Sequence, residues 1–232
     1  MKRILIASTL FVALLVMSCS ASAQFNIKRP RFYEKGYGQI SHIGTFHSWG
    51  HLWLDTDGGG EDDDKQETEY LGAIRMAGYG VINDVLDIGG YFFYQEGNTG
   101  YEDDTYGWWG SSDDSNIGDL EVFGIGFAMK LGWPVVSRVR LGFGLDVGIE
   151  FAEWNAHGWG VNDTDTMVGF TVIPRFDVDI IIFNAGSFKL GAHAGLGLLF
   201  RFHGGNIWDN PDVTARSLLF GPTMLFGITL GG

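Results

Sequence analysis

The sequence is poor in cysteine, proline and basic residues. It has one cysteine, Cys19, and five prolines, so no disulfide within the chain can hold the fold together. Lysine and arginine total 15 against 28 acidic residues, which gives a formal net charge of −13. Because a phosphate backbone is bound by clustered Lys and Arg, this balance argues against nucleic acid as a partner. Beyond residue 23 no run of 18 apolar residues occurs, so no transmembrane helix is expected.

The first 23 residues have the three parts of a secretory signal. Lys2 and Arg3 are basic, residues 4–17 are largely apolar, and Ala21-Ser22-Ala23 matches the small-residue cleavage pattern. Cleavage after Ala23, following Sec export, would remove Cys19 and change the formal charge from −13 to −15, since Lys2 and Arg3 are lost. The alternative is lipoprotein processing at Cys19. The sequence therefore predicts an exported protein.

The clearest structural signal is the segment 138–151, RVRLGFGLDVGIEF. Its odd-numbered residues from Val139 to Phe151 are large and apolar, whereas its even-numbered residues are glycines or charged residues. This period-2 alternation predicts a β-strand of more than twice the usual length of about five to six residues. A tilted strand that crosses a bilayer needs about 9–11 residues. We therefore expect the apolar face to contact lipid and the polar face to line a narrow interior.

Seven further segments have strand character, and short and long connections alternate between them. The strands are predicted at 37–54, 68–82, 85–95, 117–131, 166–183, 187–202 and 215–230. The short turns lie near 83–84, 132–137 and 184–187, and the long loops at 55–67, 97–116, 154–165 and 204–214. In the first strand Ile40, Ile43 and Trp49 do not share parity, and in the sixth Pro174 predicts a bulge or a local break.

This pattern predicts an all-β fold, an eight-stranded antiparallel up-and-down transmembrane β-barrel with short periplasmic turns and four long acidic extracellular loops. The chain is divided into a signal peptide (1–23), a periplasmic N-terminal lead-in (24–35) and the barrel (36–232). Tryptophans near the strand ends should form an aromatic girdle, with Trp49, Trp53 and Trp154 at the loop end and Trp133 at the turn end.

The two longest loops are strongly acidic, with 12 acidic residues and one lysine between positions 55–67 and 97–116. Asp55-Thr56-Asp57 suggests a calcium loop, but Gly59 occupies the fifth position, where an EF-hand needs a ligand. A solvated loop is the favoured interpretation, and weak binding of divalent cations is the alternative. No metal site and no cofactor are predicted.

The inward faces of the strands from residue 138 onward carry charges of both signs. An eight-stranded barrel is only wide enough for its side chains to fill, so these charges are expected to form a paired polar filling. A narrow or gated passage is the alternative. The predicted lumen charge network consists of Arg138, Arg140, Asp146, Glu150, Arg175, Asp177, Asp179, Lys189, His193 and Arg201.

No catalytic residues are predicted. His47 and His51 lie four residues apart, about 13 Å along a strand, and His42 has the opposite parity, so the three cannot share a metal ion. His47 and Ser48 are adjacent on a predicted strand and therefore face opposite ways, so they cannot act together as a base and a nucleophile. Glu150 and His193 could meet across the lumen, but no serine is evidently placed beside them. The prediction is that the protein is not an enzyme.

From Gly36 to Leu230 the chain resembles the small eight-stranded outer-membrane barrels of the outer membrane protein A, X and W type. Its C-terminal segment resembles a barrel-insertion signal, with Met224, Phe226, Ile228 and Leu230 alternating, although the chain ends on two glycines instead of Phe or Trp. The resemblance implies the outer membrane of a Gram-negative-type envelope. It further implies contact with lipid and lipopolysaccharide, insertion by the barrel-assembly machinery, and a monomer.

Resemblance to the W-like group of these barrels implies passage of a small hydrophobic solute. The sequence therefore predicts a structural or narrowly transporting barrel. The alternatives are a lipid A-modifying enzyme and a surface adhesin that binds through its loops.

Overall fold

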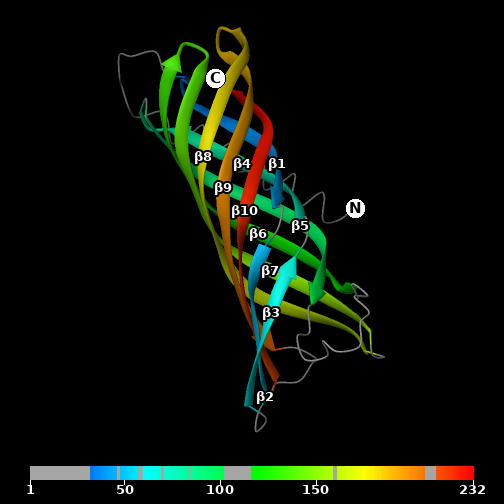
Figure 1. Cartoon of the computed structure of the whole chain (residues 1–232). Coiled ribbons are helices and arrows are strands. Elements are labelled where there is room, and N and C mark those ends of the chain that lie inside the picture. Colours follow the sequence, from blue (N-terminus) through cyan, green and yellow to red (C-terminus); the bar gives the residue numbers. More distant parts are fainter. Residues whose placement is uncertain are drawn as a thin grey trace, which may run out of the picture.

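A computed structural model describes residues 32–45, 48–56, 60–68, 71–83, 85–101, 116–158, 161–206 and 213–232. Ten strands make up the fold (Figure 1). They are β1 (Gly36–Thr45), β2 (Ser48–Thr56), β3 (Gly60–Thr68), β4 (Leu71–Val81), β5 (Leu86–Tyr101), β6 (Asn116–Val136), β7 (Val139–Gly158), β8 (Val161–Ala185), β9 (Phe188–Asn206) and β10 (Val213–Gly231).

The ten strands form a closed antiparallel barrel with eight positions around its wall. β1 and β2 lie end to end and both pair with β10, so together they occupy one position of the wall. β4 and β3 together occupy the next position, because β4 pairs with β1 and β3 pairs with β2. From β5 to β10 each strand pairs with the next, and the pairing of β1 with β10 closes the wall. The predicted eight-stranded antiparallel fold is confirmed. Among the described residues, no helix is long and apolar enough to cross a membrane.

The first predicted strand, 37–54, is divided in two because one extra residue lies between β1 and β2. Thr45 pairs with Thr223, and Trp49 pairs with Phe220. Between these two pairs the chain from β1 to β2 advances by four residues, whereas β10 advances by three. Such an offset exchanges the two faces of a strand. Thr45 is accordingly buried in the lumen, whereas Trp49, of the same parity, is 42% exposed. This offset explains why Ile40 in β1 and Trp49 in β2 have opposite parity although both face outward, whereas Ile43 differs from Ile40 because it is buried on the inner face of β1.

Of the bulge or local break predicted at Pro174, the local break is found and the bulge is not. Val172 pairs with Phe200 and Arg175 with Gly197, so the register of β8 on β9 is the same on both sides of the proline. The β8–β9 ladder is interrupted at Pro174 without a register shift, because proline has no amide hydrogen to donate. The register shift in this strand lies near the turn instead, between Ile181 and Phe183.

Several strands continue into segments that were predicted as loops. β5 extends to Tyr101, β7 to Gly158, and β8 begins at Val161. The acidic segment 60–68 is strand β3, paired along its length with β2. The predicted signal peptide and most of the lead-in, together with the loop segments 57–59, 102–115, 159–160 and 207–212, lie outside the described residues.

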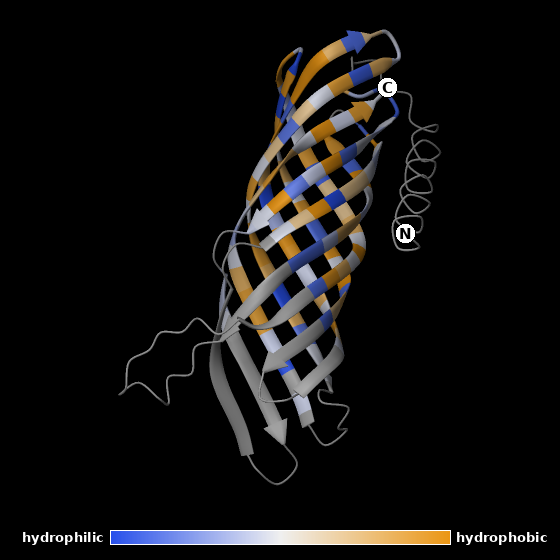
Figure 2. Ribbon diagram, turned by 90° about the vertical axis from the view of Figure 1, so that its right-hand side faces the viewer, coloured by the Kyte–Doolittle hydropathy of each residue, from blue (hydrophilic) through white to orange (hydrophobic). Residues whose placement is uncertain are grey.

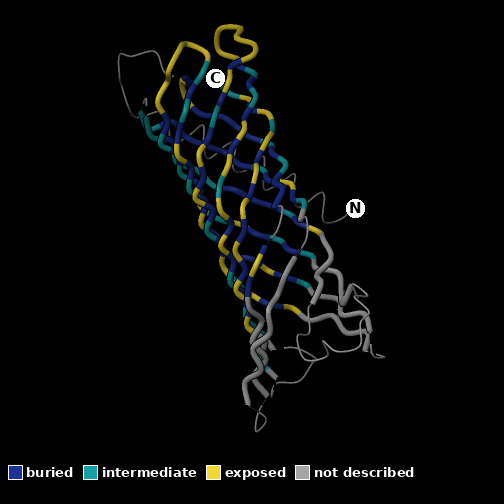
Figure 3. The backbone as a smooth tube through the Cα atoms, in the orientation of Figure 1, coloured by how far each residue is buried: buried dark blue, intermediate teal, exposed yellow. Residues whose placement is uncertain are grey.

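Alternation between the two faces of the wall is the main feature of the barrel. Orange and blue segments alternate along many of the coloured ribbons in Figure 2, and exposed and buried residues alternate most regularly along β7–β10 in Figure 3. The large apolar side chains that are exposed on β6–β10 have exposed fractions of 38–60%, and together they form an apolar belt. Examples are Phe127, Phe143, Ile149, Ile182, Leu196 and Phe226.

The turn end of the barrel holds the three short hairpins and the two ends of the described chain. Lys35 N donates to Gly232 O at 2.8 Å, so the start of β1 and the C-terminus lie side by side. Asn83 Oδ1 accepts hydrogen bonds from the amides of Val85 and Leu86, both at 2.8 Å, which closes the β4–β5 turn. Gly186 takes a positive φ of 63° in the β8–β9 turn, a conformation that suits glycine.

Candidate functional site: the polar network of the lumen

The lumen is filled by charged side chains that project inward from alternate positions of the strands. Among the described residues, six cations and five carboxylates are buried there, a near-neutral set. Glycines provide the room for them. A Cβ atom on Gly144 would lie 2.6 Å from Asp177 Oδ2 and 2.7 Å from the Arg175 guanidinium carbon. Small inward residues on one strand therefore make space for long side chains from its neighbours.

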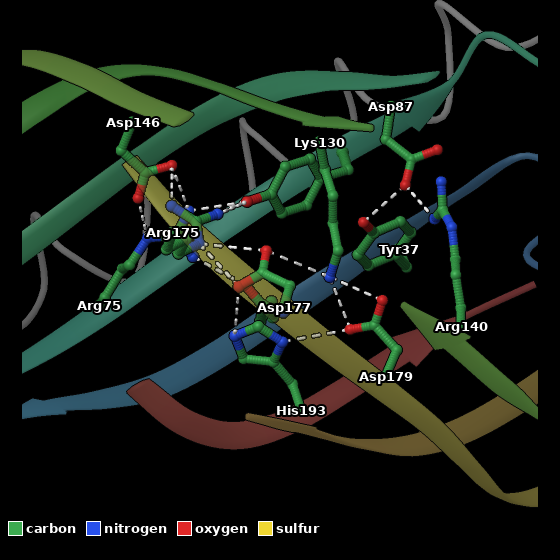
Figure 4. A network of polar contacts seen from close by, with 12 residues as sticks. Tyr37, Arg75, Asp87, Lys130, Arg140, Asp146, Arg175, Asp177, Asp179 and His193 are labelled. Carbon is green, nitrogen blue, oxygen red and sulfur yellow. Dashed lines mark hydrogen bonds and ion pairs between the residues drawn. The ribbon is translucent and has the colours of Figure 1, made fainter. Parts of the chain in front are cut away.

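Asp146, in β7, is at the centre of the network (Figure 4). Its two oxygens are each 2.7 Å from a guanidinium nitrogen, Oδ2 from Arg75 Nε and Oδ1 from Arg175 Nη1. Arg75 Nη2 and Arg175 Nη2 also donate to Tyr79 OH, at 2.7 and 3.0 Å. Arg75 Nη1 donates to Gln39 Oε1 at 2.8 Å. One carboxylate thus holds two arginines from β4 and β8 together across the lumen.

Lys130 organises the next layer toward the turn end. Its Nζ lies 2.6 Å from Asp179 Oδ2 and 3.5 Å from Asp177 Oδ2. His193 Nδ1 is 3.1 Å from Asp179 Oδ1, and Arg175 Nε is 3.0 Å from Asp177 Oδ1. Asp177 therefore joins this layer to the Asp146 layer, and Figure 4 shows the two as one continuous set of contacts.

At the turn end the network continues into aromatic side chains. Arg140 Nη1 pairs with Asp87 Oδ2, which also accepts from Tyr37 OH at 2.8 Å. Tyr37 stacks between Tyr79 and Tyr33, with ring centroids 4.9 and 4.3 Å apart. Burial is the main cause that raises the pKa of the Tyr33 hydroxyl well above its ordinary value, so this group stays neutral.

At the loop end a smaller cluster forms around Glu150. Its Oε2 is 2.7 Å from Arg201 Nε and 2.8 Å from His203 Nε2. Arg201 Nη2 donates to Gln95 Oε1 at 2.6 Å, and its guanidinium lies 5.7 Å from the Phe93 ring centroid, within cation–π range. The carboxylate of Glu150 is thus paired with one arginine and one histidine of the same strand, β9.

The predicted lumen network lies inside the barrel with one correction. Arg138 is exposed, because β7 begins only at Val139 and Arg138 belongs to the turn that precedes it. The other predicted residues are buried in the lumen, namely Arg140, Asp146, Glu150, Arg175, Asp177, Asp179, Lys189, His193 and Arg201. Of the predicted girdle, Trp49 and Trp133 are exposed on the outer face, at 42% and 48%. Trp53 and Trp154 lie where only the backbone is described.

Sequence reasoning missed four charged or titratable groups of the network, Arg75, Asp87, Lys130 and His203. For Lys130 the signal was present in the sequence, because it has the opposite parity to the alternating apolar residues Phe123, Ile125, Phe127, Met129 and Leu131. For Arg75 and Asp87 the strands contain inward aromatic residues, so hydrophobicity did not distinguish their two faces. Tyr79 and Tyr91 are both almost fully buried on the same side as Arg75 and Asp87.

The chemistry that this arrangement can perform is limited. No group of three metal-ligating side chains is found among the residues with described placement. Glu150 pairs with His203, and His193 pairs with Asp179, so the pairing of Glu150 with His193 considered from the sequence does not occur. Ser217 is the cross-strand neighbour of His203 in the β9–β10 pairing and is buried at 3% exposure. Glu150, His203 and Ser217 therefore form the one serine–histidine–acid row that we identify among the described residues.

Outside the lumen, a hollow of about 620 Å³ opens on the outer face of β6 and β7. Its outward walls are Ile125, Val147, Ile149 and Phe170, which belong to the apolar faces of β6, β7 and β8. Gly126, Gly148 and the lumen-facing Tyr91 also line it. The hollow therefore opens on the outer face of the barrel, and at its two glycines it reaches the ring of Tyr91.

The chain is similar in fold to solved structures of small outer-membrane proteins. OprG from Pseudomonas aeruginosa is 9% identical over 87% of this chain and 98% of that chain, with a TM-score of 0.46. AlkL, solved in lipid bilayers, is 12% identical over 89% and 94%, with a TM-score of 0.44. Neisserial surface protein A is 14% identical over 82% and 95%, with a TM-score of 0.40. No family model and no curated protein matches the sequence.

At these identities the likeness concerns the fold alone. Its own strand pairing, closed between β1 and β10, gives it the eight-stranded architecture of the small outer-membrane barrels.

Proposed function

We propose that the protein is an integral outer-membrane barrel that is closed along its axis and has a structural role in the envelope. The observation that supports this proposal best is the succession of paired charges through the lumen. It runs from Arg140 and Asp87 at the turn end, through Lys130 and Asp146, to Glu150 at the loop end. The side chains of these five residues are at most 2% exposed.

Pairing of this kind opposes the passage of solutes. A hydrated ion that moved along the axis would have to separate buried pairs, and breaking one buried pair costs about 3–5 kcal/mol. A small hydrophobic solute would meet the same charges without being able to solvate them. The lumen is therefore better suited to hold the wall together than to conduct.

The outer face supports residence in a membrane. Exposed apolar side chains such as Phe143, Ile182 and Leu196, each 59–60% exposed, would be unfavourable in water but match a hydrocarbon environment. Export through the Sec pathway, insertion by the barrel-assembly machinery, contact with lipopolysaccharide and a monomeric state are parts of the same proposal. The monomeric state is supported by the pairing of β1 with β10, which closes the wall and leaves no unpaired edge at that seam for a partner chain.

Planar-bilayer conductance tests the proposal. The wild-type protein should give no current steps over a wide voltage range. The double variant Arg75→Ala/Asp146→Ala removes a pair from the centre of the lumen and serves as the open control, which should conduct if it folds. Discrete current steps from the folded wild-type protein would refute an axially closed barrel.

A second candidate function is hydrolysis of an acyl ester, and the row of Glu150, His203 and Ser217 favours it. His203 Nε2 is held by Glu150, which orients the ring, and Ser217 is the neighbouring residue on β10. In this alternative Ser217 would act as the nucleophile and His203 as its base. A change in the mass of lipid A that requires the wild-type protein and is lost in Ser217→Ala would favour the enzyme over the structural barrel.

A further inference from the structure

Phe32 and Tyr33 fill the turn end of the lumen, although they do not belong to any strand. Both precede β1, which begins at Gly36, yet their side chains are only 7% and 1% exposed. The rest of the polar network that we describe comes from the strands of the wall. These two residues are therefore an insert that the wall surrounds.

The barrel has a slot that fits the Tyr33 ring. A Cβ atom on Gly231 would lie 2.8 Å from Tyr33 Cδ1, and one on Gly191 would lie 3.0 Å from Tyr33 OH. Any larger residue at these two positions would intrude on the ring. Tyr33 OH forms a 2.6 Å hydrogen bond with Thr229 Oγ1, and the ring stacks on Tyr37. The slot thus combines steric fit with one directed hydrogen bond.

Hydrogen bonds flank the insert on both sides. Lys189 Nζ, from β9, donates to Phe32 O at 3.0 Å. Lys35 N donates to Gly232 O at 2.8 Å, and Val81 N donates to Lys35 O at 3.1 Å. The two Lys35 bonds continue the β1–β10 and β1–β4 ladders by one residue and therefore belong to the wall. The insert itself is held by the Lys189 bond to Phe32 O and by the Tyr33 bond to Thr229, so its withdrawal would break neither of these ladders.

We propose that Phe32 and Tyr33 form a removable plug that controls access to the lumen from the turn end. With the plug in place, the Tyr37–Asp87–Arg140 layer is covered from that side, since Tyr33 stacks directly on Tyr37. Withdrawal of the plug exposes this layer, while the Asp146 layer further in stays closed. The proposal adds a regulated mouth to the closed barrel of the proposed function, and it holds for the folded barrel whether or not the axis conducts.

Site-directed thiol labelling tests this proposal on the folded protein. Replacing Cys19 by serine leaves the full chain without cysteine, so one introduced thiol can be followed. Thr229→Cys places it beside Tyr33, and Thr223→Cys places it on the same strand six residues deeper. Both positions face the lumen and are at most 2% exposed. Reaction with a water-soluble maleimide then reports how often each position becomes accessible.

Adding Tyr33→Ala should raise the labelling rate at position 229 by about tenfold or more, because the buried ring no longer covers it. The rate at position 223 should not change. Tyr33→Phe, which keeps the ring, should behave like the parent chain, since the hydrogen bond to Thr229 is already absent in Thr229→Cys. Heat-modifiable gel migration of each variant verifies that the barrel has folded.

An unchanged rate at position 229 in the Tyr33→Ala chain would refute the plug. Equal acceleration at positions 229 and 223 would refute it as well, because it would show that the whole barrel loosens. Conductance is not part of these readouts, so failure of the plug and failure of the axially closed barrel are distinguishable.

Discussion

Replacing Asp146 by asparagine is expected to be among the most destabilising isosteric changes in the lumen. The substitution keeps the size of the side chain but removes the one carboxylate that contacts both Arg75 and Arg175. The two arginines are affected unequally. Arg175 keeps Asp177 at 3.0 Å, whereas the remaining hydrogen-bond acceptors of the Arg75 guanidinium are the neutral groups Gln39 Oε1 and Tyr79 OH.

The expected loss of unfolding free energy depends on this difference between Arg75 and Arg175. Two unit charges about 4 Å apart attract each other by about 4 kcal/mol at an effective dielectric constant of about 20. Removing one partner of a buried pair costs about 3–5 kcal/mol, chiefly because it leaves the other charge uncompensated. Since only Arg75 loses its sole carboxylate, we expect a loss of about 3–5 kcal/mol in the free energy of unfolding for Asp146→Asn, not twice that amount.

Two comparison variants make this expectation specific. Asp177→Asn should cost less, about 1–3 kcal/mol, because Arg175 keeps Asp146 and Lys130 keeps Asp179 at 2.6 Å. Arg138→Gln, at an exposed turn residue, should change the stability by no more than about 0.5 kcal/mol. Reversible urea unfolding in lipid vesicles, followed by tryptophan fluorescence and gel migration, gives all three values. A loss below about 1 kcal/mol for Asp146→Asn, or a larger loss for Asp177→Asn, would refute the reasoning.

Three further outcomes are expected from the outer face and from the glycines. Leu196 is 60% exposed midway along β9, and Leu196→Arg should lower the free energy of unfolding in bilayers by about 2–4 kcal/mol. Ser187→Arg, in the turn, should leave it unchanged. Equal effects of the two substitutions would show that the apolar belt lies elsewhere. Gly148→Ala should sharply reduce the folded yield in refolding assays, because its Cβ would lie 2.4 Å from Tyr91 OH and 2.6 Å from Ile125 O. Gly186→Ala meets no atom within 4 Å, so it should cost only the strain of its positive φ, about 1–2 kcal/mol in urea titrations.

The outer half of this fold could be predicted from the sequence because one uniform condition determines it. Every outward residue meets the same apolar surroundings, so parity alone assigned Phe143 and Ile149 in β7 and Leu196 in β9 to the outside. Parity failed to assign the faces where an extra residue shifts the register between neighbouring strands. The extra residue between β1 and β2 exchanges the faces, and the sequence could show this only as apolar residues of mixed parity.

The inner half was only partly predictable, because its pairing depends on strands that are distant in the sequence. Parity placed Asp146 and Arg175 inside, but Arg75, which is 71 residues from Asp146, joins them only after the barrel has closed. The sequence also gave no reason to prefer His203 over His193 as the partner of Glu150. Both histidines face inward on β9, and the register of β7, β8 and β9 decides between them by bringing Glu150, Gly169 and His203 into one row.

That row also shows how a glycine can direct a polar contact. Gly169 lies between Glu150 and His203 in the pairing, and a Cβ atom there would be 2.3 Å from His203 Cδ2. The imidazole therefore extends over the glycine to reach the carboxylate two strands away. Gly144 has the same function beside Asp177 and Arg175. Inward glycines such as Gly144 and Gly169 are accordingly part of the polar network, because the absence of their side chains lets charged and polar groups from neighbouring strands cross them and meet.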